Sequence, residues 1–549
     1  MSDERSSLRR RLLCRIVDFS KSPRARVRLV GVLGGLYLLV WCHGFLATWG
    51  TSLPAVAGLA AGLTLGLELA WLRRSRQNRP AATVGRTSSP SASVAFADGL
   101  EVRPTETETE TETDTGTDGV LRRVPAWTPF ALHLGLAAWT IALPWLSDAW
   151  SAVVARIPVT TLAVPAVTWI VLIAGGVLLL SVPAFLVAGA GLWGSAARKS
   201  GQPPFSSSPV DRHSADSHSA AECLRSWLVG VAGGLVLGVF IVAPTAGLEY
   251  GGTAAALVGA AIAVVHLMRG SRDAQGVLSI SAPAETHSAS FETAAARWSK
   301  RSSTHLWTFA IGCIAGAFFA ASQRLAHQLM PAASATLAVQ WAALLLAAAG
   351  GLGWARRRHS AGRTQDEIEA TVCLQAAVAF AIVPLVFPLL IDSILLLNSH
   401  VASVWMLLAG RSLLAGLLVA PAGACLGVVL ARAFAPHGQP AAEHDNTASA
   451  AAEQQVRTVA LPFASFALGL VAARLLITHG VASAMLAIVA AGLLALQGAA
   501  RSLRNRPAAP AWRPRLVVAG ACVLPVVAAV WHTGHEPARA ARLLFSTNV

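Results

Sequence analysis

The chain has 549 residues, of which 54% are hydrophobic and 13% are charged, and its formal net charge is +15. The charged share is about half of that in soluble domains, and the mean hydropathy is +0.56. These values exclude a soluble globular protein and a disordered chain. Seven cysteines without a Cys-x-x-Cys pair also exclude a disulfide-rich secreted scaffold. We therefore predict an all-α fold, a polytopic integral membrane bundle of helices.

Thirteen apolar runs are long enough to cross a hydrocarbon core about 30 Å thick as helices. Each run must be helical, because lipid cannot satisfy an open backbone and the period-two alternation of a β-barrel is absent from these runs. They form six hairpins with shorter outer connections, followed by one last helix. In chain order, the predicted spans are 28–48, 53–72, 126–147, 163–192, 226–247, 252–268, 305–322, 332–354, 371–397, 401–431, 458–477, 481–499 and 515–532.

The spans divide the chain into five segments. Residues 1–27 form a basic N-terminal segment, and 28–72 form the first hairpin. Residues 73–125 are rich in Ser, Thr and acidic side chains, which predicts a disordered linker because no apolar face is available for packing. Residues 126–532 hold the remaining spans with polar linkers between them. Residues 533–549 form a tail in which a further domain could begin.

Lys and Arg residues are distributed unevenly between the two sides of the predicted bundle. The N-terminus and the loops after the even-numbered spans hold 37 of the 43, which predicts a cytoplasmic N-terminus. Thirteen spans would place the C-terminus outside, a parity that depends on counting 163–192 and 401–431 as one span each. Arg411 and Arg474 lie within spans. Arg474 is near the outer end of its span, and we expect its side chain to extend its charge to the interface. The four basic residues on the opposite side are Arg156, Arg324, Arg539 and Arg542.

The ends of the spans account for the positive charge. Clusters such as Arg9–Arg11, Arg73–Arg74 and Arg356–Arg358 flank spans on the cytoplasmic side, where they can bind anionic lipid headgroups. Trp residues gather near span ends, as in an interfacial belt. Nucleic-acid binding would instead require basic and aromatic residues interleaved on one surface. We therefore predict the lipid bilayer as the partner and no nucleic acid.

Glycines recur at four-residue spacing within several spans. On one helical face, this spacing lets neighbouring backbones approach closely. The pattern predicts close packing inside the bundle, and it leaves open self-association of two chains or helices that slide during transport. The glycines concerned are Gly58, Gly62 and Gly66; Gly230, Gly234 and Gly238; Gly312 and Gly316; and Gly423 and Gly427.

Motifs for catalysis and cofactor binding are missing from the sequence. The pattern Gly-x-Gly-x-x-Gly at 189–194 follows a membrane helix instead of a strand, so it does not predict a nucleotide-binding fold. The chain contains neither a Gly-x-x-x-x-Gly-Lys-Ser/Thr phosphate loop nor a His-Glu-x-x-His motif. Dispersed donor groups at 105–118, 213–218 and 532–536 lack the arrangement of a metal site. We expect no catalytic residue, no cofactor and no metal in these 549 residues.

Charged residues inside spans are the most informative polar positions, because each costs about 2.5–3.5 kcal/mol near mid-bilayer on insertion scales. Arg411 lies well inside its span, and Asp392 lies toward the outer end of the preceding span, which Pro384 and Pro388 interrupt. A broken helix is tolerated where it lines a cavity. We predict an intramembrane polar site built from Arg411, Asp392 and Asn398. The alternative is that Arg411 snorkels or pairs in a structural role.

The last nine residues resemble a known protein family. They read Ala541-Arg542-Leu543-Leu544-Phe545-Ser546-Thr547-Asn548-Val549, which is similar to the segment that joins a multispan membrane region to a spermidine-synthase-like domain in large fused bacterial proteins. The resemblance implies that a Rossmann-like aminopropyltransferase or methyltransferase-type domain would follow and that the chain lies in the bacterial plasma membrane. None of that family's catalytic residues has a counterpart here. The predicted outside C-terminus conflicts with the cytosolic substrate of such a synthase, decarboxylated S-adenosylmethionine.

Three functions stay open. The leading one is the membrane region of a spermidine-synthase-like fusion protein, so that enzyme activity would depend on a downstream domain. The second is a complete secondary transporter, because the span count resembles the major facilitator class, although the loop at 72–76 lacks the Gly-x-x-x-Asp-Arg pattern of that class. The third is a membrane scaffold or lipid-handling protein. The downstream reading frame would separate the first function from the other two.

Overall fold

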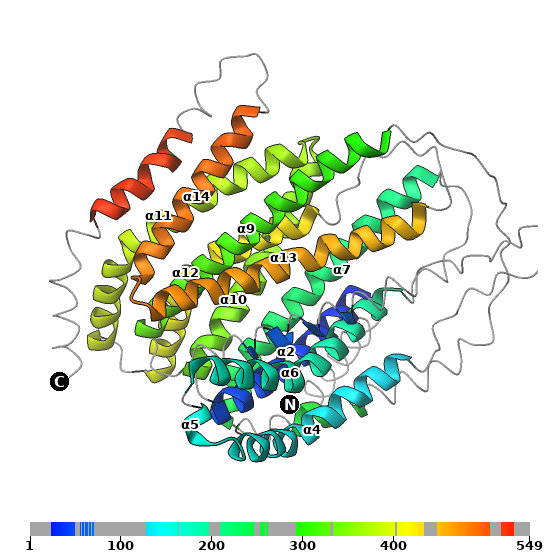
Figure 1. Cartoon of the computed structure of the whole chain (residues 1–549), viewed down its shortest axis with the longest axis vertical. Coiled ribbons are helices and arrows are strands. Elements are labelled where there is room, and N and C mark those ends of the chain that lie inside the picture. Colours follow the sequence, from blue (N-terminus) through cyan, green and yellow to red (C-terminus); the bar gives the residue numbers. More distant parts are fainter. Residues whose placement is uncertain are drawn as a thin grey trace, which may run out of the picture.

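The computed structural model describes the chain in blocks, and within them the chain is helical apart from short turns and bends. No strand occurs in these blocks (Figure 1), which confirms the predicted all-α class. The predicted linker at 73–125 and the tail at 533–549 lie outside the described residues. The blocks are 23–49, scattered positions from 55 to 70, 128–196, 209–247, 253–261, 293–329, 333–400, 403–432, 447–504 and 518–531, with single-residue gaps at 163, 246 and 259.

The helices up to residue 261 make up what we call the N-terminal half. The described positions from 55 to 70 and from 253 to 261 are helical and belong to it. The last labelled helix, α7, continues through the π-helix η2 to residue 245. The labelled elements are α2 (Pro23–Trp49), α4 (Thr128–Ala155), α5 (Val159–Leu162), α6 (Pro165–Ala196), α7 (Pro209–Leu237) and η2 (Gly238–Val242).

Residues 293–504 make up the C-terminal half. An additional apolar helix, Val518–Trp531, follows it. The labelled helices of this half are α9 (Thr293–Leu329), α10 (Ala333–Ser360), α11 (Gln365–His400), α12 (Val404–Arg432), α13 (Thr447–Thr478) and α14 (Ser483–Arg504).

Nine helices within the described residues are long and apolar enough to span a membrane: α2, α6, α7 with its continuation, and α9 to α14. The predicted count of thirteen is not confirmed. At the other four predicted spans the described residues are helical, but α4 and the helical positions at 55–70, 253–261 and 518–531 are not among the nine. The side of the membrane on which the C-terminus lies therefore stays a prediction.

Helix boundaries depart from the predicted spans at their polar ends. α7 begins at Pro209 and α13 at Thr447, inside the segments 199–222 and 435–456 that the sequence predicts as linkers. An apolar run ends where the lipid ends, whereas the Ala-, Glu- and Gln-rich start of α13 favours helix outside lipid as well. Pro209 also suits the first turn of a helix, where its missing amide hydrogen would be unpaired anyway.

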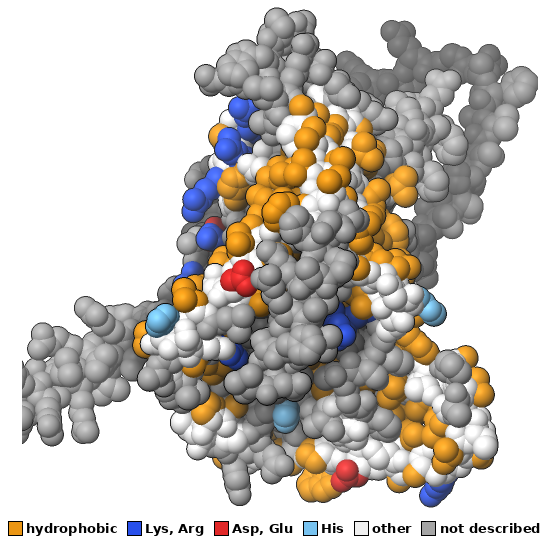
Figure 2. All heavy atoms as spheres, turned by 90° about the vertical axis from the view of Figure 1, so that its left-hand side faces the viewer, with side chains coloured by type: hydrophobic (Ala, Val, Ile, Leu, Met, Phe, Trp, Pro, Cys, Tyr) orange, Lys and Arg blue, Asp and Glu red, His pale blue; other side chains and the backbone are white. Residues whose placement is uncertain are grey.

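Apolar side chains cover much of the outside of the bundle. Large side chains such as Leu389, Leu396 and Val530 are more than half exposed. On the face shown in Figure 2, hydrophobic side chains form a broad surface, and many of the Lys and Arg side chains lie along one edge. Hydrocarbon is the solvent that suits such a surface. The bilayer is therefore a partner of this protein.

The two halves repeat one pattern of helix packing. In the N-terminal half α2 packs on α7, the helical positions at 55–70 pack on α6, and α4 packs on α6. In the C-terminal half α9 packs on α13, α10 on α12, and α11 on α12. We number the predicted spans from one within each half. In both halves the first span then contacts the fifth, the second contacts the fourth, and the third contacts the fourth. The halves meet where α7 packs on α10 (Figure 1).

Glycines lie at the closest of these helix contacts. A Cβ atom added to Gly234 of α7 would lie 2.0 Å from the carbonyl oxygen of Val32 in α2. One added to Gly427 of α12 would lie 2.0 Å from that of Ala348 in α10. No side chain larger than hydrogen fits at such distances. All four glycine faces noted in the sequence contact neighbours in the same chain, so they are not free for self-association of two chains.

We expect Gly351→Ala to destabilise the C-terminal half, because the added methyl group would lie 2.3 Å from the carbonyl oxygen of Ala424. Overpacking of this kind costs about 1–3 kcal/mol. Thermal unfolding of the purified protein in detergent measures the effect. A Cβ atom added to the preceding residue, Gly350, has no neighbour within 4 Å among the described residues. Gly350→Ala is therefore the control, and an equal loss in both variants would contradict the packing described above.

Candidate functional site

A pocket lies between the two halves, and both halves contribute to its walls; its empty space, including the part open to solvent, is about 660 Å³. We call it the seam pocket. Most of its lining is apolar, and Gln323 and His43 supply polar side chains. The N-terminal half contributes Leu38, Leu39, Cys42, His43 and Leu46 of α2, Leu59 and Leu63 of the helical positions at 55–70, and Leu235 of α7. The C-terminal half contributes Gln323 of α9, Leu337, Ala338 and Trp341 of α10, and Leu470 of α13.

The seam pocket lies toward one end of the bundle. Its lining residues in α2, α9 and α13 are near the C-terminal ends of those helices, and those in α10 are near its N-terminal end. The split of basic residues predicts that these helix ends face outside. The pocket is therefore nearer the predicted outer surface than the predicted cytoplasmic one.

Two aromatic side chains of α2 hold the helix that forms one wall of the seam pocket. Tyr37 and Trp41 are fully buried and stacked, with ring centroids 5.5 Å apart. The Tyr37 hydroxyl donates to the carbonyl oxygen of Ala255 at 2.8 Å, and Trp41 Nε1 donates to Thr140 Oγ1 at 3.1 Å. Each bond satisfies a polar atom that burial would otherwise leave unpaired. These bonds hold α2 against α4 and against the helical residues at 253–261.

A buried amide gives the seam pocket its polar side. Gln323 is 1% exposed, and its Oε1 accepts a hydrogen bond from Arg474 of α13. Gln340 of α10 is fully buried and donates through Nε2 to the backbone oxygen of Gln323 at 3.4 Å. These three side chains link α9, α10 and α13 beside the pocket.

This polar group was not predicted from the sequence. Arg474 was expected to extend to the interface, but its guanidinium donates inward to Gln323. The direction of that side chain depends on the packing of α13 against α9, which the sequence of one span does not encode. Gln323 and Gln340 in or beside apolar runs could have indicated this polar group, because amide side chains within spans commonly form hydrogen bonds between helices.

Two of the three residues predicted to form a site on the α11–α12 hairpin are joined by a hydrogen bond. Arg411 donates to Asn398 Oδ1 at 2.7 Å. Among the described residues no ion pair joins Arg411 to Asp392, and Asp392 and Asn398 are both exposed. Any role of these three residues as a functional site stays a prediction.

Two features of the hairpin differ from the sequence prediction. The helix α11 runs as one element from Gln365 to His400 with Pro384 and Pro388 inside it, so the predicted interruption is wrong. Side chains of neighbouring helices can satisfy the backbone groups that a proline leaves unpaired, so the helix continues through both prolines. Arg411 lies seven residues after the start of α12, which is about 10 Å along the helix. It is therefore nearer the end of the bundle than predicted.

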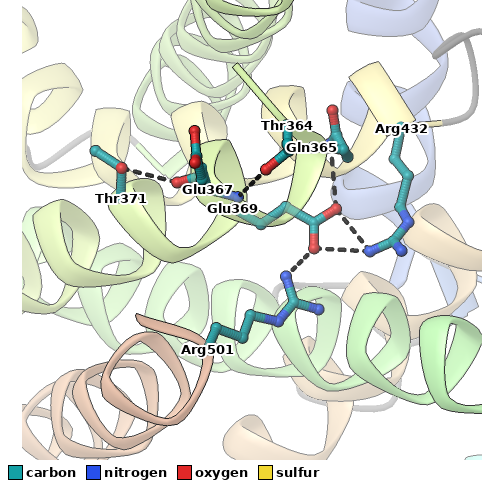
Figure 3. A network of polar contacts seen from close by, with 7 residues as sticks. All are labelled: Thr364, Gln365, Glu367, Glu369, Thr371, Arg432 and Arg501. Carbon is teal, nitrogen blue, oxygen red and sulfur yellow. Dashed lines mark hydrogen bonds and ion pairs between the residues drawn. The ribbon is translucent and has the colours of Figure 1, made fainter. Parts of the chain in front are cut away.

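A second polar cluster lies at the predicted cytoplasmic end of the C-terminal half (Figure 3). Glu369 of α11 is 2% exposed, and both of its carboxylate oxygens accept hydrogen bonds from Arg432 of α12 at 2.7 Å. Arg501 of α14 and Gln365 donate to the same carboxylate. The guanidinium of Arg501 also lies 5.1 Å from the ring centre of Trp307 of α9. One carboxylate thus connects three helices directly and a fourth through Arg501.

The charges of this cluster match the helix ends on which they lie. Glu369 is near the N-terminus of α11, where the helix dipole favours a negative charge. Arg432 and Arg501 are near the C-termini of α12 and α14, where it favours positive charges. Glu369 was not predicted as a site residue, because it lies just before the predicted span at 371–397.

Within the described residues, no three His, Cys, Asp or Glu side chains gather in a way that could hold a metal ion. The donor groups noted at 105–118 and 532–536 lie outside those residues. The group at 213–218 lies in α7, where the side chains are not described.

No family model matches the chain, and no curated protein matches it either. Its helices include nine of sufficient length and hydropathy to cross a bilayer, counted over the described residues. The chain is a multispan helical membrane protein. Residues 541–549, which carry the resemblance to spermidine-synthase-like fusion proteins, lie outside the described residues. That family assignment therefore stays a prediction.

Proposed function

We propose that this membrane protein is a secondary transporter that moves a small solute through the seam between its two halves. The observation that carries the proposal is the seam pocket, whose walls come from two halves with the same helix packing. Many secondary transporters are built from repeated halves and bind their substrate at the interface between them. Its mostly apolar lining with a few polar side chains, among them Gln323, is also typical of a small-molecule site.

Contacts inside each half differ from contacts across the seam. Inside the halves, glycines let backbones approach so closely that sliding of one helix on another would produce clashes. At the seam, Leu235 of α7 packs in one cluster with Ala338 and Trp341 of α10, so the two halves meet through side chains. Side chains can change rotamer with a small movement of the backbone. Each half would thus move as a rigid body, and the seam would open to one side and then to the other.

The native cysteines offer a test of this movement. In one variant, six of the seven cysteines are replaced by Ser so that only Cys42, which lines the seam pocket, remains. We expect a membrane-impermeant maleimide to label Cys42 from either side of oriented vesicles, because alternating access exposes the pocket to both sides. In the control variant only Cys425 remains, which is buried in the core of the C-terminal half. It should stay unlabelled from both sides.

The labelling pattern separates transport from the other functions. Reaction of Cys42 from one side only, or from neither side, would contradict alternating access and favour a scaffold role. Thermal unfolding of both variants confirms that they are folded before the labelling rates are compared.

A second proposal rests on residues 541–549. Their resemblance to the junction segment of fused bacterial proteins supports a role as the membrane region of a spermidine-synthase-like fusion protein. The gene tests it directly. A reading frame that continues past Val549 into a Gly-rich strand–helix unit would support this role, and a stop codon at that point would contradict it.

A further inference from the structure

Three basic side chains gather beside the seam pocket at its predicted outer end. Arg474 donates to the pocket-lining Gln323, and Arg324 and His327 of α9 lie close enough to interact electrostatically with Arg474 or with each other. We call Arg324, His327 and Arg474 the outer basic cluster. Only four of the 43 Lys and Arg residues occur in predicted outer segments. A cluster there opposes the charge distribution that governs the rest of the chain.

The outer basic cluster has no carboxylate partner within the described part of the chain. The ion pairs found there involve Arg356, Arg363, Arg432 and Arg501. Arg324 and Arg474 carry like charges that repel one another, so a negative charge supplied from elsewhere would stabilise them.

Two buried polar atoms next to the pocket also lack partners. Arg474 Nε and Gln340 Oε1 are buried and have no hydrogen-bond partner within the described residues. Buried polar atoms in folded proteins are nearly always paired, and an unpaired one marks a place that water or a ligand completes. The donor on Arg474 suits a negatively charged oxygen, because charge-assisted hydrogen bonds are the strongest that a guanidinium makes.

We infer that the seam pocket binds an amphipathic anion, an apolar chain that carries a carboxylate or phosphate head group. The apolar chain packs among Leu38, Leu59, Leu470 and Trp341. The head group lies toward Gln323 and the outer basic cluster. This inference rests on the proposed transport function and names the substrate class of the same pocket.

Decanoate is the probe for this inference, with decanol and decyltrimethylammonium as neutral and cationic probes of the same chain length. Binding to the full chain in zwitterionic nanodiscs is measured by titration calorimetry, with empty nanodiscs subtracted. We expect decanoate to bind about tenfold or more tightly than decanol, since a hydrogen bond to a charged group adds at least that much. Decyltrimethylammonium should bind more weakly than decanol.

Charge variants connect the preference to the outer basic cluster. Arg474→Gln should reduce decanoate binding to the level of decanol binding and leave decanol binding unchanged. Arg324→Gln removes a more exposed charge, keeps the Arg474–Gln323 bond intact, and should weaken decanoate binding several-fold. The control is Arg156→Gln, which removes an exposed predicted outer arginine that does not line the pocket. It should leave all three affinities unchanged.

The outcomes separate this inference from the proposed function. Equal binding of decanoate and decanol, or a preference for the cation, would overturn the anionic substrate class while two-sided labelling of Cys42 would still support transport. If decanoate binds selectively but Cys42 is not labelled from both sides, the proposed transport would be overturned and the anion site would stand. In nanodiscs that contain phosphatidylglycerol, lost decanoate binding would identify a lipid head group as the source of the anion. Unchanged binding would identify a free solute.

Discussion

Glu369→Ala is expected to lower the free energy of unfolding by about 3–5 kcal/mol, because it removes a buried carboxylate to which two buried arginines are hydrogen-bonded. The variant would leave Arg432 and Arg501 without the carboxylate that accepts their hydrogen bonds. Both arginine side chains are mostly buried, so water cannot readily take the place of the lost carboxylate. Thermal or denaturant unfolding in detergent measures the loss.

Glu367→Ala is the matched control, two residues earlier in the same helix. Glu367 pairs with Arg363 at 3.5 Å, and the two side chains are 40% and 60% exposed, so its loss should cost less than about 1 kcal/mol. Replacing the whole cluster with apolar residues, as in Glu369→Leu with Arg432→Met and Arg501→Met, should recover most of the stability lost in Glu369→Ala. A loss in Glu369→Ala as small as that in Glu367→Ala would show that the cluster does not hold the helices together.

Bilayer physics made the helices predictable from the sequence. Lipid requires the backbone to be paired within each span, so apolar length alone locates helices such as α2, α6 and α12. The same argument stops at the lipid boundary. α7 and α13 begin before the predicted spans at 226–247 and 458–477, in polar segments whose helical structure hydropathy does not predict.

The partners of each helix could not be predicted. The spacing of Gly230 and Gly234 indicated a close backbone contact, but not that its partner is α2, about two hundred residues earlier in the chain. Contacts between distant segments depend on the shape of both surfaces, and one sequence without its neighbours shows only one of them. For this reason the repeated packing of the two halves could not be predicted from the sequence.

The same limit explains the polar residues. Arg411 and Asn398 are close in the chain, on one hairpin, and the sequence suggested that they share a site; the structure shows a hydrogen bond between them. Arg474 and Gln323 are far apart in the chain, and only the packing of α9 on α13 brings them together. Reading charges span by span therefore favours local pairs over the group that lines the seam pocket.

Trp41→Ala is expected to destabilise the N-terminal half by about 3–5 kcal/mol, because it leaves a large cavity in a packed interior. The Trp41 side chain is fully buried, stacks on Tyr37 and donates to Thr140. Trp41→Phe should retain most of the packing and lose about 1 kcal/mol with the hydrogen bond.

Trp145→Ala is the control for Trp41→Ala, since Trp145 of α4 is 68% exposed and its loss should change stability by less than about 0.5 kcal/mol. The comparison also reports on the seam pocket, because Trp41 precedes Cys42 and holds α2 against α4. In the variant that retains only Cys42, Trp41→Ala should raise the rate of maleimide labelling, whereas Trp145→Ala should leave it unchanged. If Trp41→Ala destabilises the protein but the labelling rate stays the same, the position of α2 does not control access to the pocket, and the wall that opens must belong to the C-terminal half.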